Sequence, residues 1–291
     1  MLTLRQLIDG ATSILAEAGV ASPQRDALAL AQYCLGLPRL ELAMAPDMTS
    51  DQMAQFTALV DRRRRREPLQ QIVGSTGFRY ITLQMMPGVF VPRPETEVVA
   101  GVAIAEIDRL LSLESRPVLL VDLCTGSGAI AASAADETSA QIVAIDADPD
   151  AVTLARRNTA SAGDRVRIEL GDVRDPDLLA DLAGTVDVVV SNPPYIPLDA
   201  VPIDPEVADH DPELALYGGG LDGMALPTAV VHAAQRLLRP AGLLVMEHAD
   251  SQGGQARAVA LATAGFAEVG TGMDLTERDR YLWARRHDEP R

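Results

Sequence analysis

The stretch that decides the fold is VLLVDLCTGSGAIA, residues 118–131. Its run of aliphatic residues predicts a buried strand, Gly126 and Gly128 predict a tight turn, and the small apolar residues that follow predict a helix. Glycine lets the backbone approach a ligand closely, and Ala131 stands at the close-packing position of the nucleotide-binding pattern G-x-G-x-x-G/A. A glycine turn that serves only to reverse the chain is the competing interpretation of this pattern.

Outward from this stretch, helices and short aliphatic strands alternate from Glu95 onward. Such alternation is typical of an α/β fold with a doubly wound parallel sheet. Seven strands are predicted, at Val118–Asp122, Gln141–Asp146, Arg165–Leu170, Val186–Ser191, Gly242–Glu247, Phe266–Thr271 and Tyr281–Arg285.

The part of the chain before this sheet reads as helical. Apolar residues recur at helical spacing near the N-terminus, where Thr3 and Gln6 form the pattern of a capping box. Short alternating pieces such as FRYITLQM, residues 78–85, then predict a β-hairpin. We therefore expect a helical domain over 1–72, a β-hairpin linker over 73–94 and a sheet domain over 95–291.

Three acidic residues follow strands of the predicted sheet. Asp122, Asp146 and Asp172 each stand where a strand ends, and the carboxyl edge of an open parallel sheet is where ligands bind. Asp146 comes twenty residues after Gly126, which is the usual place of an acidic residue that binds ribose hydroxyls. Several carboxylates around one crevice suit a nucleoside ligand with positive charge better than a diphosphate.

A second stretch, VVVSNPPYIP at residues 188–197, predicts a stiff turn at the end of a core strand. Two prolines fix φ and remove two backbone donors, so the carbonyls of the turn remain free to accept hydrogen bonds. Such a turn is suited to receive a donor group. A strand with a proline-stiffened end and no chemical role is the alternative.

Composition narrows the class of protein further. The 291 residues carry 25 basic and 41 acidic side chains, and the net charge of −16 disfavours stable binding to nucleic acid. Two cysteines, Cys34 and Cys124, suit a reduced, cytoplasmic protein. No signal segment, membrane-spanning run or metal-ligand spacing is recognised, so we expect no metal and no membrane contact.

Several motifs together resemble one enzyme family. DLCTGSGAI resembles motif I of the class I S-adenosylmethionine-dependent methyltransferases, and SNPPYIP resembles their motif IV as found in methyltransferases of amino groups. Four further stretches are similar to the HemK/PrmC family, which methylates glutamine in release factors: residues 66–78 (REPLQQIVGSTGF), 89–97 (VFVPRPETE), 205–224 (PEVADHDPELALYGGGLDGM) and 245–250 (VMEHAD). The likeness covers essentially the whole chain.

The resemblance implies a Rossmann-like seven-stranded methyltransferase fold and a monomer whose helical domain binds class I peptide chain release factors. It implies methyl transfer from S-adenosylmethionine, giving S-adenosylhomocysteine, to the side-chain nitrogen of the glutamine in a Gly-Gly-Gln motif. The implied cofactor residues are Asp122, Cys124, Thr125, Gly126, Ser127, Gly128, Asp146, Asp172, Val173 and Asn192. The implied substrate residues are Arg93, Asn192, Pro193, Pro194 and Tyr195, of which Asn192, Pro193 and Tyr195 carry the catalysis.

The chemistry of an amide explains the role of the Asn-Pro-Pro-Tyr turn, residues 192–195. An amide nitrogen is a poor nucleophile because its lone pair is delocalised. Acceptors on both of its N–H bonds would align it and stabilise its developing charge, and the Asn192 side-chain oxygen and the Pro193 carbonyl are the candidates. The Tyr195 ring is expected to pack on the flat amide.

Two positions depart from the family pattern. Cys124 replaces a glycine, and a cysteine there is expected to hold an ordinary φ in a turn that tolerates its Cβ. Val173 stands where some members carry an aromatic residue that stacks on adenine, which leaves only aliphatic packing.

Other features have alternative interpretations. Arg62–Arg66 reads mainly as a solvated helix end, with partner docking as the alternative. Arg93 either begins a helix or closes over cofactor or substrate. The Gly-Gly-Gln of residues 253–255 copies the family's target tripeptide, which we interpret as coincidence.

Two other functions compete with glutamine methylation. An adenine- or guanine-directed nucleic-acid methyltransferase would share the chemistry, but it should carry a basic groove. A nicotinamide-dependent dehydrogenase or nucleotide-binding regulator would use the glycine turn and leave Asn192–Tyr195 unexplained.

Overall fold

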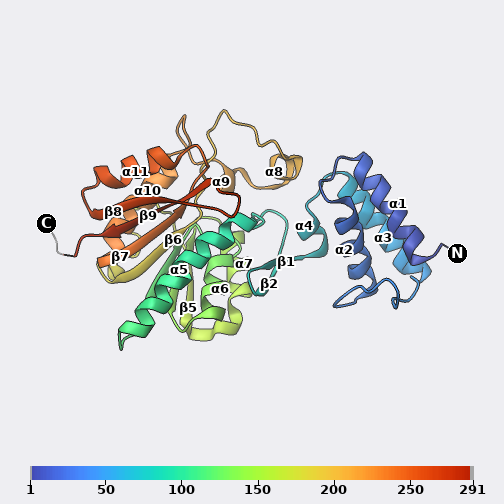
Figure 1. Ribbon diagram of the computed structural model, residues 1–291, viewed down its shortest axis with the longest axis horizontal. Helices are drawn as coiled ribbons and strands as arrows, with labels where there is room; N and C mark the ends of the chain where they lie inside the picture. The colour runs from blue at the N-terminus through green and yellow to red at the C-terminus, as the bar shows by residue number, and fades with distance from the viewer. Residues whose placement is uncertain (1, 289–291) are drawn as a thin grey trace. The chain divides into compact units, whose positions relative to one another are not determined.

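The computed structural model describes residues 2–288, and the chain divides into two compact units. One unit comprises Met1–Ser75 together with Pro202–His210, and the other comprises Thr76–Val201 together with Asp211–Arg291. Each unit has a hydrophobic core of its own. Figure 1 labels the helices and strands of both.

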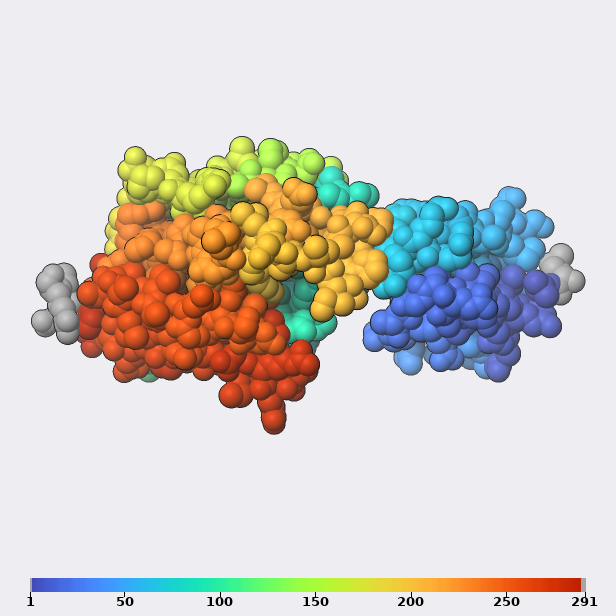
Figure 2. All heavy atoms as spheres, turned by 90° about the horizontal axis from the view of Figure 1, so that it is seen from above, coloured from blue at the N-terminus to red at the C-terminus, as the bar shows by residue number. Residues whose placement is uncertain are grey.

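The first unit is helical. It contains α1 (Leu4–Glu17), α2 (Pro23–Leu35), α3 (Ser50–Arg64), α4 (Leu69–Val73) and, from the later segment, α8 (Pro205–His210). Thr3 with Gln6 and Thr49 with Gln52 form complete capping boxes at the starts of α1 and α3, as the sequence predicts for Thr3. Leu15, Leu30 and Phe56 meet in its core, so three amphipathic faces bury one another. Figure 2 shows the part of this unit from α1 to α4 as spheres, coloured blue to cyan.

The predicted hairpin is present as a two-stranded sheet. It consists of β1 (Ser75–Phe78) and β2 (Ile81–Gln84), and Arg79 between them has φ 50°. Phe78 and Leu83 are buried in the core of the second unit, which anchors the hairpin there. Tyr80 at its tip is 81% exposed.

The second unit contains a seven-stranded sheet with helices on both faces, which confirms the predicted α/β fold. Its strands are β3 (Leu119–Leu123), β4 (Gln141–Asp146), β5 (Val166–Leu170), β6 (Val186–Ser191), β7 (Leu238–Glu247), β8 (Phe266–Met273) and β9 (Asp279–Arg286), in the order β5-β4-β3-β6-β7-β9-β8. β9 runs antiparallel to both of its neighbours, and the other described strand pairs of this sheet are parallel. The helices are α5 (Pro94–Leu113), α6 (Ala129–Glu137), α7 (Pro149–Asn158), α9 (Glu213–Leu216), α10 (Ala225–Leu237) and α11 (Gly253–Ala262), with short 3₁₀ turns at Ala160–Arg165 and Ala180–Leu182.

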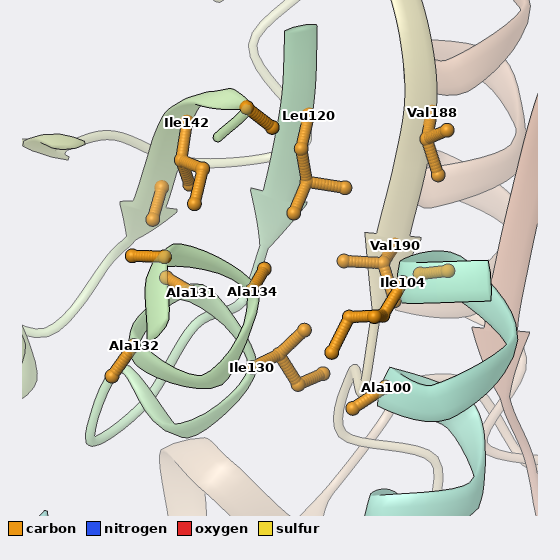
Figure 3. Close-up of a cluster of buried hydrophobic side chains, with 14 of the residues drawn as sticks. Ala100, Ile104, Leu120, Ile130, Ala131, Ala132, Ala134, Ile142, Val188 and Val190 are labelled. Atoms are coloured by element: carbon orange, nitrogen blue, oxygen red, sulfur yellow. The ribbon is translucent and has the colours of Figure 1, made fainter. Parts of the chain in front are cut away.

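Two hydrophobic layers enclose this sheet. On one face Leu120, Val188 and Val190 pack against α5, α6 and α7. Figure 3 shows this layer, in which Ala100 and Ile104 of α5 and Ile130 of α6 point toward the strands. On the other face the alternate strand residues, such as Val121 and Val189, pack against α10 and α11.

The topology places a switch point of the strand order beside the central strand. The chain passes from β3 to β4 and β5 on one side, and then returns to β6 on the other side of β3. From the carboxyl end of β3 the chain proceeds toward β4, and from that of β6 it proceeds toward β7, in opposite directions along the sheet. Open α/β sheets bind ligands at such a point. The glycine turn follows β3 and the Asn-Pro-Pro-Tyr turn follows β6, so both predicted motifs lie at this switch point.

Candidate active site

The glycine turn after β3 is held by the end of β4. The Gly126 nitrogen donates to Asp146 Oδ2 over 2.7 Å, and the Thr125 nitrogen donates to the Ile145 carbonyl over 2.9 Å. Gly126 has φ 57°, and a Cβ there would meet no atom within 4 Å, so the backbone faces open space that a ligand can enter.

Gly128 serves a different purpose in the same turn. It has φ 79° and caps α6, and a Cβ there would lie 3.0 Å from Ala155 of α7. The second glycine is therefore needed for close packing of two helices, whereas the first leaves room for a ligand. Ser127 between them is buried, and its carbonyl accepts from Asn158 Nδ2 over 2.9 Å.

The expectation of an ordinary φ at Cys124 is wrong. Cys124 has φ 59°, in the left-handed region that favours glycine. The turn imposes this conformation, because Thr125 on its C-terminal side is bonded to both β4 and Asp122. Burial raises the pKa of the Cys124 thiol, so the side chain stays neutral.

Asp122 is a fully buried carboxylate near the end of β3, next to the glycine turn. Its Oδ2 accepts from the Thr125 hydroxyl over 2.6 Å, whereas Oδ1 is buried and has no hydrogen-bond partner among the described residues. Burial, together with the charge of Asp146, raises the pKa of Asp122 to about 7. A buried carboxylate oxygen without a donor is costly, so a ligand that supplies positive charge fits this position.

Asp146 and Asp172 lie at the same sheet edge in different environments. Burial raises the pKa of Asp146, and its two oxygens accept from the backbone nitrogens of Gly126 and Asp148. Asp172 is paired with Arg174 over 2.5 Å, which lowers the pKa of its carboxyl. Among the described residues Asp172 is thus paired with a cation, whereas Asp122 and Asp146 form no ion pair, and these two residues fit the positively charged S-adenosylmethionine.

Val173 lies in the hydrophobic layer under this edge. It is buried with Ile145 and Leu178 in the core on one face of the sheet. Its side chain thus packs on aliphatic neighbours, as its residue type suggests.

The Asn-Pro-Pro-Tyr turn begins at the buried end of β6. The Ser191 hydroxyl donates to the Leu123 carbonyl over 2.7 Å, which fastens the start of the turn to β3. Asn192 is half-buried, and its Nδ2 donates to the Thr96 hydroxyl over 3.0 Å. Pro193 is buried, whereas Pro194 and Tyr195 are half-buried. The Asn-Pro-Pro-Tyr turn thus begins next to the end of β3, which the glycine turn follows.

A glycine-rich loop packs directly on the backbone of this turn. The Ile196 nitrogen donates to the Leu216 carbonyl, and the Gly218 nitrogen donates to the Ile196 carbonyl. A Cβ on Gly223 would lie 2.2 Å from the Tyr195 carbonyl oxygen, and one on Gly218 would lie 2.7 Å from that of Pro194. Glycine is required at both positions because the two backbones touch.

Three residues of the site were not assigned a role from the sequence. Gln252 is buried, and its Nε2 donates to the carbonyls of Tyr195 and Asp222 over 2.8 and 3.0 Å. Thr96 of α5 and Glu247 of β7 are buried beside Asn192, and the Thr96 hydroxyl donates to Glu247 Oε2 over 2.8 Å. Glu247 could have been found, because it ends the strand next to β6. Nothing in the spacing of the other two indicated their role.

Arg93 occupies the cap position before α5. Its Nη2 donates to Asp211 Oδ2 over 2.5 Å, and its guanidinium lies 4.8 Å from the Phe90 ring centroid. Arg93 therefore joins the start of α5 to the loop that follows the Asn-Pro-Pro-Tyr turn.

The interpretation of Arg62–Arg66 as a solvated helix end is wrong for two of its members. Arg63 is 6% exposed and pairs with Asp26 and Glu206, each over 2.7 Å. Arg66 pairs with Glu206 over 2.5 Å. Within the helical unit these guanidiniums bind the segment Pro202–His210, and a run of like charges could not indicate which members find partners.

The internal Gly-Gly-Gln lies at the start of α11. Gly253 is the first residue of that helix, and Gln255 is exposed in its first turn. The tripeptide is therefore helical in this protein.

Residues 2–288 contain no group of three His, Cys, Asp or Glu side chains arranged to hold a metal ion. No helix in this range is long and apolar enough to cross a bilayer.

Comparisons with known proteins agree with the fold. Residues 6–74 match the family described as PrmC N-terminal domain, and residues 117–277 match the family described as Methyltransferase domain. Among solved structures, the chain is similar to a 16S rRNA N2 G1207 methyltransferase of T. thermophilus in complex with AdoMet and guanosine, with a TM-score of 0.51 and 19% identity over 73% of this chain and 50% of that chain. This likeness shows the shared methyltransferase fold.

Two curated relatives match nearly the whole chain. The release factor glutamine methyltransferase of Streptomyces coelicolor is 47% identical, over 95% of this chain and 95% of its own. That of Bifidobacterium longum is 43% identical, over 97% of this chain and 99% of its own. Identity at this level over both units shows that the chain belongs to the release factor glutamine methyltransferase family.

Proposed function

We propose that this protein transfers a methyl group from S-adenosylmethionine to the side-chain amide nitrogen of the glutamine in the Gly-Gly-Gln motif of class I peptide chain release factors. The observation that carries the proposal is the position of Asn192 and Pro193 at the end of β6, beside the glycine turn of β3. The two curated relatives with that name support the choice of substrate.

The bound cofactor supplies an electrophilic methyl group on a sulfonium centre. We assign its binding to the glycine turn and to Asp122 and Asp146, whose carboxylates are hydrogen-bonded to that turn. A new bond joins the methyl carbon to the glutamine nitrogen, the carbon–sulfur bond breaks with its electron pair on sulfur, and an amide proton passes to water. S-adenosylhomocysteine and the methylated glutamine are the products.

The chain contributes alignment and charge stabilisation to this step. The Asn192 Oδ1 and the Pro193 carbonyl accept from the two N–H bonds of the glutamine, which holds the nitrogen toward the methyl group. The same dipoles stabilise the positive charge that develops on nitrogen. A strong base is unnecessary, because the nitrogen becomes acidic as the new bond forms. The Tyr195 ring bounds the pocket.

We also propose that the helical unit contributes to release factor binding. An open hollow of about 750 Å³ lies against α1 and α3 and is lined by apolar residues that include Leu7, Ile14 and Phe56. Ile14 is 42% exposed there. The Ile14→Asp variant is expected to raise KM for an intact release factor and to leave KM for a short glutamine peptide unchanged.

The primary experiment supplies radiolabelled S-adenosylmethionine together with release factor, tRNA, rRNA and DNA, and then separates the products. Label is expected on the release factor alone, and mass spectrometry should place it on the Gly-Gly-Gln glutamine. A release factor with asparagine at that position should remain unlabelled, because its side chain is one methylene shorter. Label on nucleic acid would favour the base-directed alternative.

We propose that the protein acts as a cytoplasmic monomer, and sedimentation tests its oligomeric state.

A further inference from the structure

A series of three hydrogen bonds lies behind Asn192 and includes Thr96 and Glu247, two residues that have no role in the proposed function. Asn192 Nδ2 donates to Thr96 Oγ1 over 3.0 Å, and Thr96 Oγ1 donates to Glu247 Oε2 over 2.8 Å. The Tyr195 hydroxyl donates to the other oxygen of Glu247 over 3.3 Å. These hydrogen bonds join the turn after β6, the first turn of α5 and the end of β7.

The chemistry of these groups fixes which atom donates and which accepts in each of the three hydrogen bonds. An ionised carboxylate can only accept, and a hydroxyl has one hydrogen to donate. With that hydrogen on Glu247, the Thr96 oxygen is left as an acceptor. Asn192 must then turn its NH₂ group toward Thr96, which directs its oxygen to the opposite side of the planar amide.

This direction matters because a side-chain amide has nearly the same shape in two orientations. If Asn192 rotated by half a turn about its last torsion, its NH₂ would face the substrate. A donor there could not accept from the glutamine N–H, and the alignment described above would be lost.

We propose that Thr96 and Glu247 are positioning residues that hold the Asn192 side chain with its oxygen toward the substrate amide, an inference that rests on the proposed function. Neither residue needs to touch the glutamine. They act by making the other orientation of Asn192 unfavourable.

The burial of this pair supports a functional reason for it. Thr96 is 3% exposed and Glu247 is 1% exposed, and the described hydrogen-bond partners of Glu247 are two hydroxyls rather than a cation. A buried carboxylate that is held only by hydroxyls lowers the stability of the fold. An apolar side chain would avoid this cost if the residue served packing alone.

The charge of Glu247 is set by groups from several elements. Burial raises the pKa of Glu247 to about 7, against the hydrogen bond from Thr96. Arg280 of β9 and the Tyr195 hydroxyl also favour the ionised form, whereas Glu95 of α5 opposes it. Once protonated, Glu247 can donate a hydrogen bond to Thr96. The Thr96 hydrogen is then free to point at Asn192, so the donors and acceptors of the hydrogen bonds exchange roles. Acidification should therefore lower the rate of transfer.

The test compares three variants of the full-length protein. Thr96→Val removes the hydroxyl at constant shape and should lower kcat by about tenfold or more, with Kd for S-adenosylmethionine within about twofold of wild type. Thr96→Ser restores the hydroxyl and should recover most of the activity. Glu247→Gln should remove the rise of kcat with pH near 7. Thr159→Val is the matched control, because Thr159 is also buried and its hydroxyl binds only the Ala155 carbonyl among described groups.

A second readout does not depend on activity. In protein labelled with ¹⁵N on asparagine side chains, the Asn192 NH₂ signals should shift with pH near 7 in wild type and lose that shift in Glu247→Gln. Asn192→Asp assigns the signals. If these signals do not respond to pH, or if Thr96→Val transfers methyl groups as fast as wild type, the inference is overturned. Equal losses in Thr96→Ser and Thr96→Val would also overturn it, because packing alone would then explain both.

The two proposals fail in different ways. If wild-type protein does not methylate the release factor, the proposed function fails, and the ¹⁵N experiment still decides whether Thr96 and Glu247 orient Asn192. If wild type is active and the variants match it, only the positioning role fails.

Discussion

The backbone nitrogen of Gly126 donates a hydrogen bond of 2.7 Å to Asp146, which joins the turn after β3 to the end of β4. The carboxylate that we assign to the cofactor thus also fixes the loop that should surround it. Each oxygen of Asp146 has one backbone donor and retains a further lone pair for a ligand hydroxyl.

Asp146→Ala is therefore expected to weaken S-adenosylmethionine binding by about tenfold or more, since hydrogen bonds to a charged group are lost. The fold should persist, because the sheet core does not include Asp146. Isothermal calorimetry measures the affinity, and circular dichroism checks the fold. Asp181→Ala, which removes an exposed carboxylate far along the chain, is the control. Unchanged affinity in Asp146→Ala would count against the assignment.

The raised pKa of Asp122 predicts that cofactor affinity depends on pH. A positively charged ligand favours the ionised carboxylate, so affinity should be full above the pKa of about 7 and should fall below it. From pH 7.5 to pH 6 we expect Kd to rise by about tenfold, in line with the loss of the ionised form. Asp122→Asn should bind weakly at both pH values. A Kd for wild type that does not change over this range would show that Asp122 does not sense the ligand charge.

Asn192→Ala should retain the fold and most of the cofactor affinity, and should lose methyl transfer by about a hundredfold or more. Single-turnover transfer to release factor measures the rate. Asn192→Asp keeps an acceptor of the same size and adds a negative charge near the cofactor, so partial activity is expected. Normal turnover by Asn192→Ala would refute the role assigned to this amide.

Gly223→Ala tests the contact between the glycine-rich loop and the Asn-Pro-Pro-Tyr turn. A Cβ there would lie 2.2 Å from the Tyr195 carbonyl oxygen, so the turn must shift. We expect kcat to fall by about tenfold or more and Kd for the cofactor to change little. Gly184→Ala has the same left-handed strain, with φ 71°, and open space around its Cβ, so it isolates the contact from the strain. Equal kinetics for the two variants would remove the loop from the explanation.

Glu206→Gln tests the ion pairs of the helical unit. Burial works to raise the pKa of Glu206, but its bonds to Arg66 and Arg63 outweigh this and lower it to about 2. A lowered pKa in the folded state stabilises the fold above the unfolded value of about 4.5, and this stabilisation is lost as pH falls toward 2. The variant should be less stable at pH 7 by roughly 1–3 kcal/mol, and the difference should narrow between pH 4.5 and 2. Denaturant unfolding measures it, and a difference that is constant with pH would show that charge plays no part.

The sequence patterns predicted the sheet well where aliphatic residues form unbroken runs. The bounds of β4 and β6 match the prediction, because Gln141–Asp146 and Val186–Ser191 lie between clear turn residues. β7 begins at Leu238, four residues before the predicted start, because Pro240 and Ala241 read as a turn although Leu238 already pairs with Val186. Local pattern cannot show pairing across a register shift.

The site was less predictable from the sequence where a residue's conformation depends on backbone geometry or on partners that are distant in the chain. A cysteine at φ 59° follows from the bonds of its neighbours, which a preference of the residue type cannot reveal. Thr96 and Glu247 are separated by 151 positions, and their contact depends on the packing of α5 over the end of β7. The short helices α8 and α9 likewise lie in a loop whose sequence has no helical period.

The segment Pro202–His210 gives the helical unit an unusual order of synthesis. Its N-terminal helices leave the ribosome more than a hundred residues before Glu206, so the partner of Arg66 does not yet exist when those helices first fold. Asp26 is by then the available carboxylate for Arg63. Formation of the complete helical unit must therefore wait until β6 and the turn that we propose for catalysis have been translated.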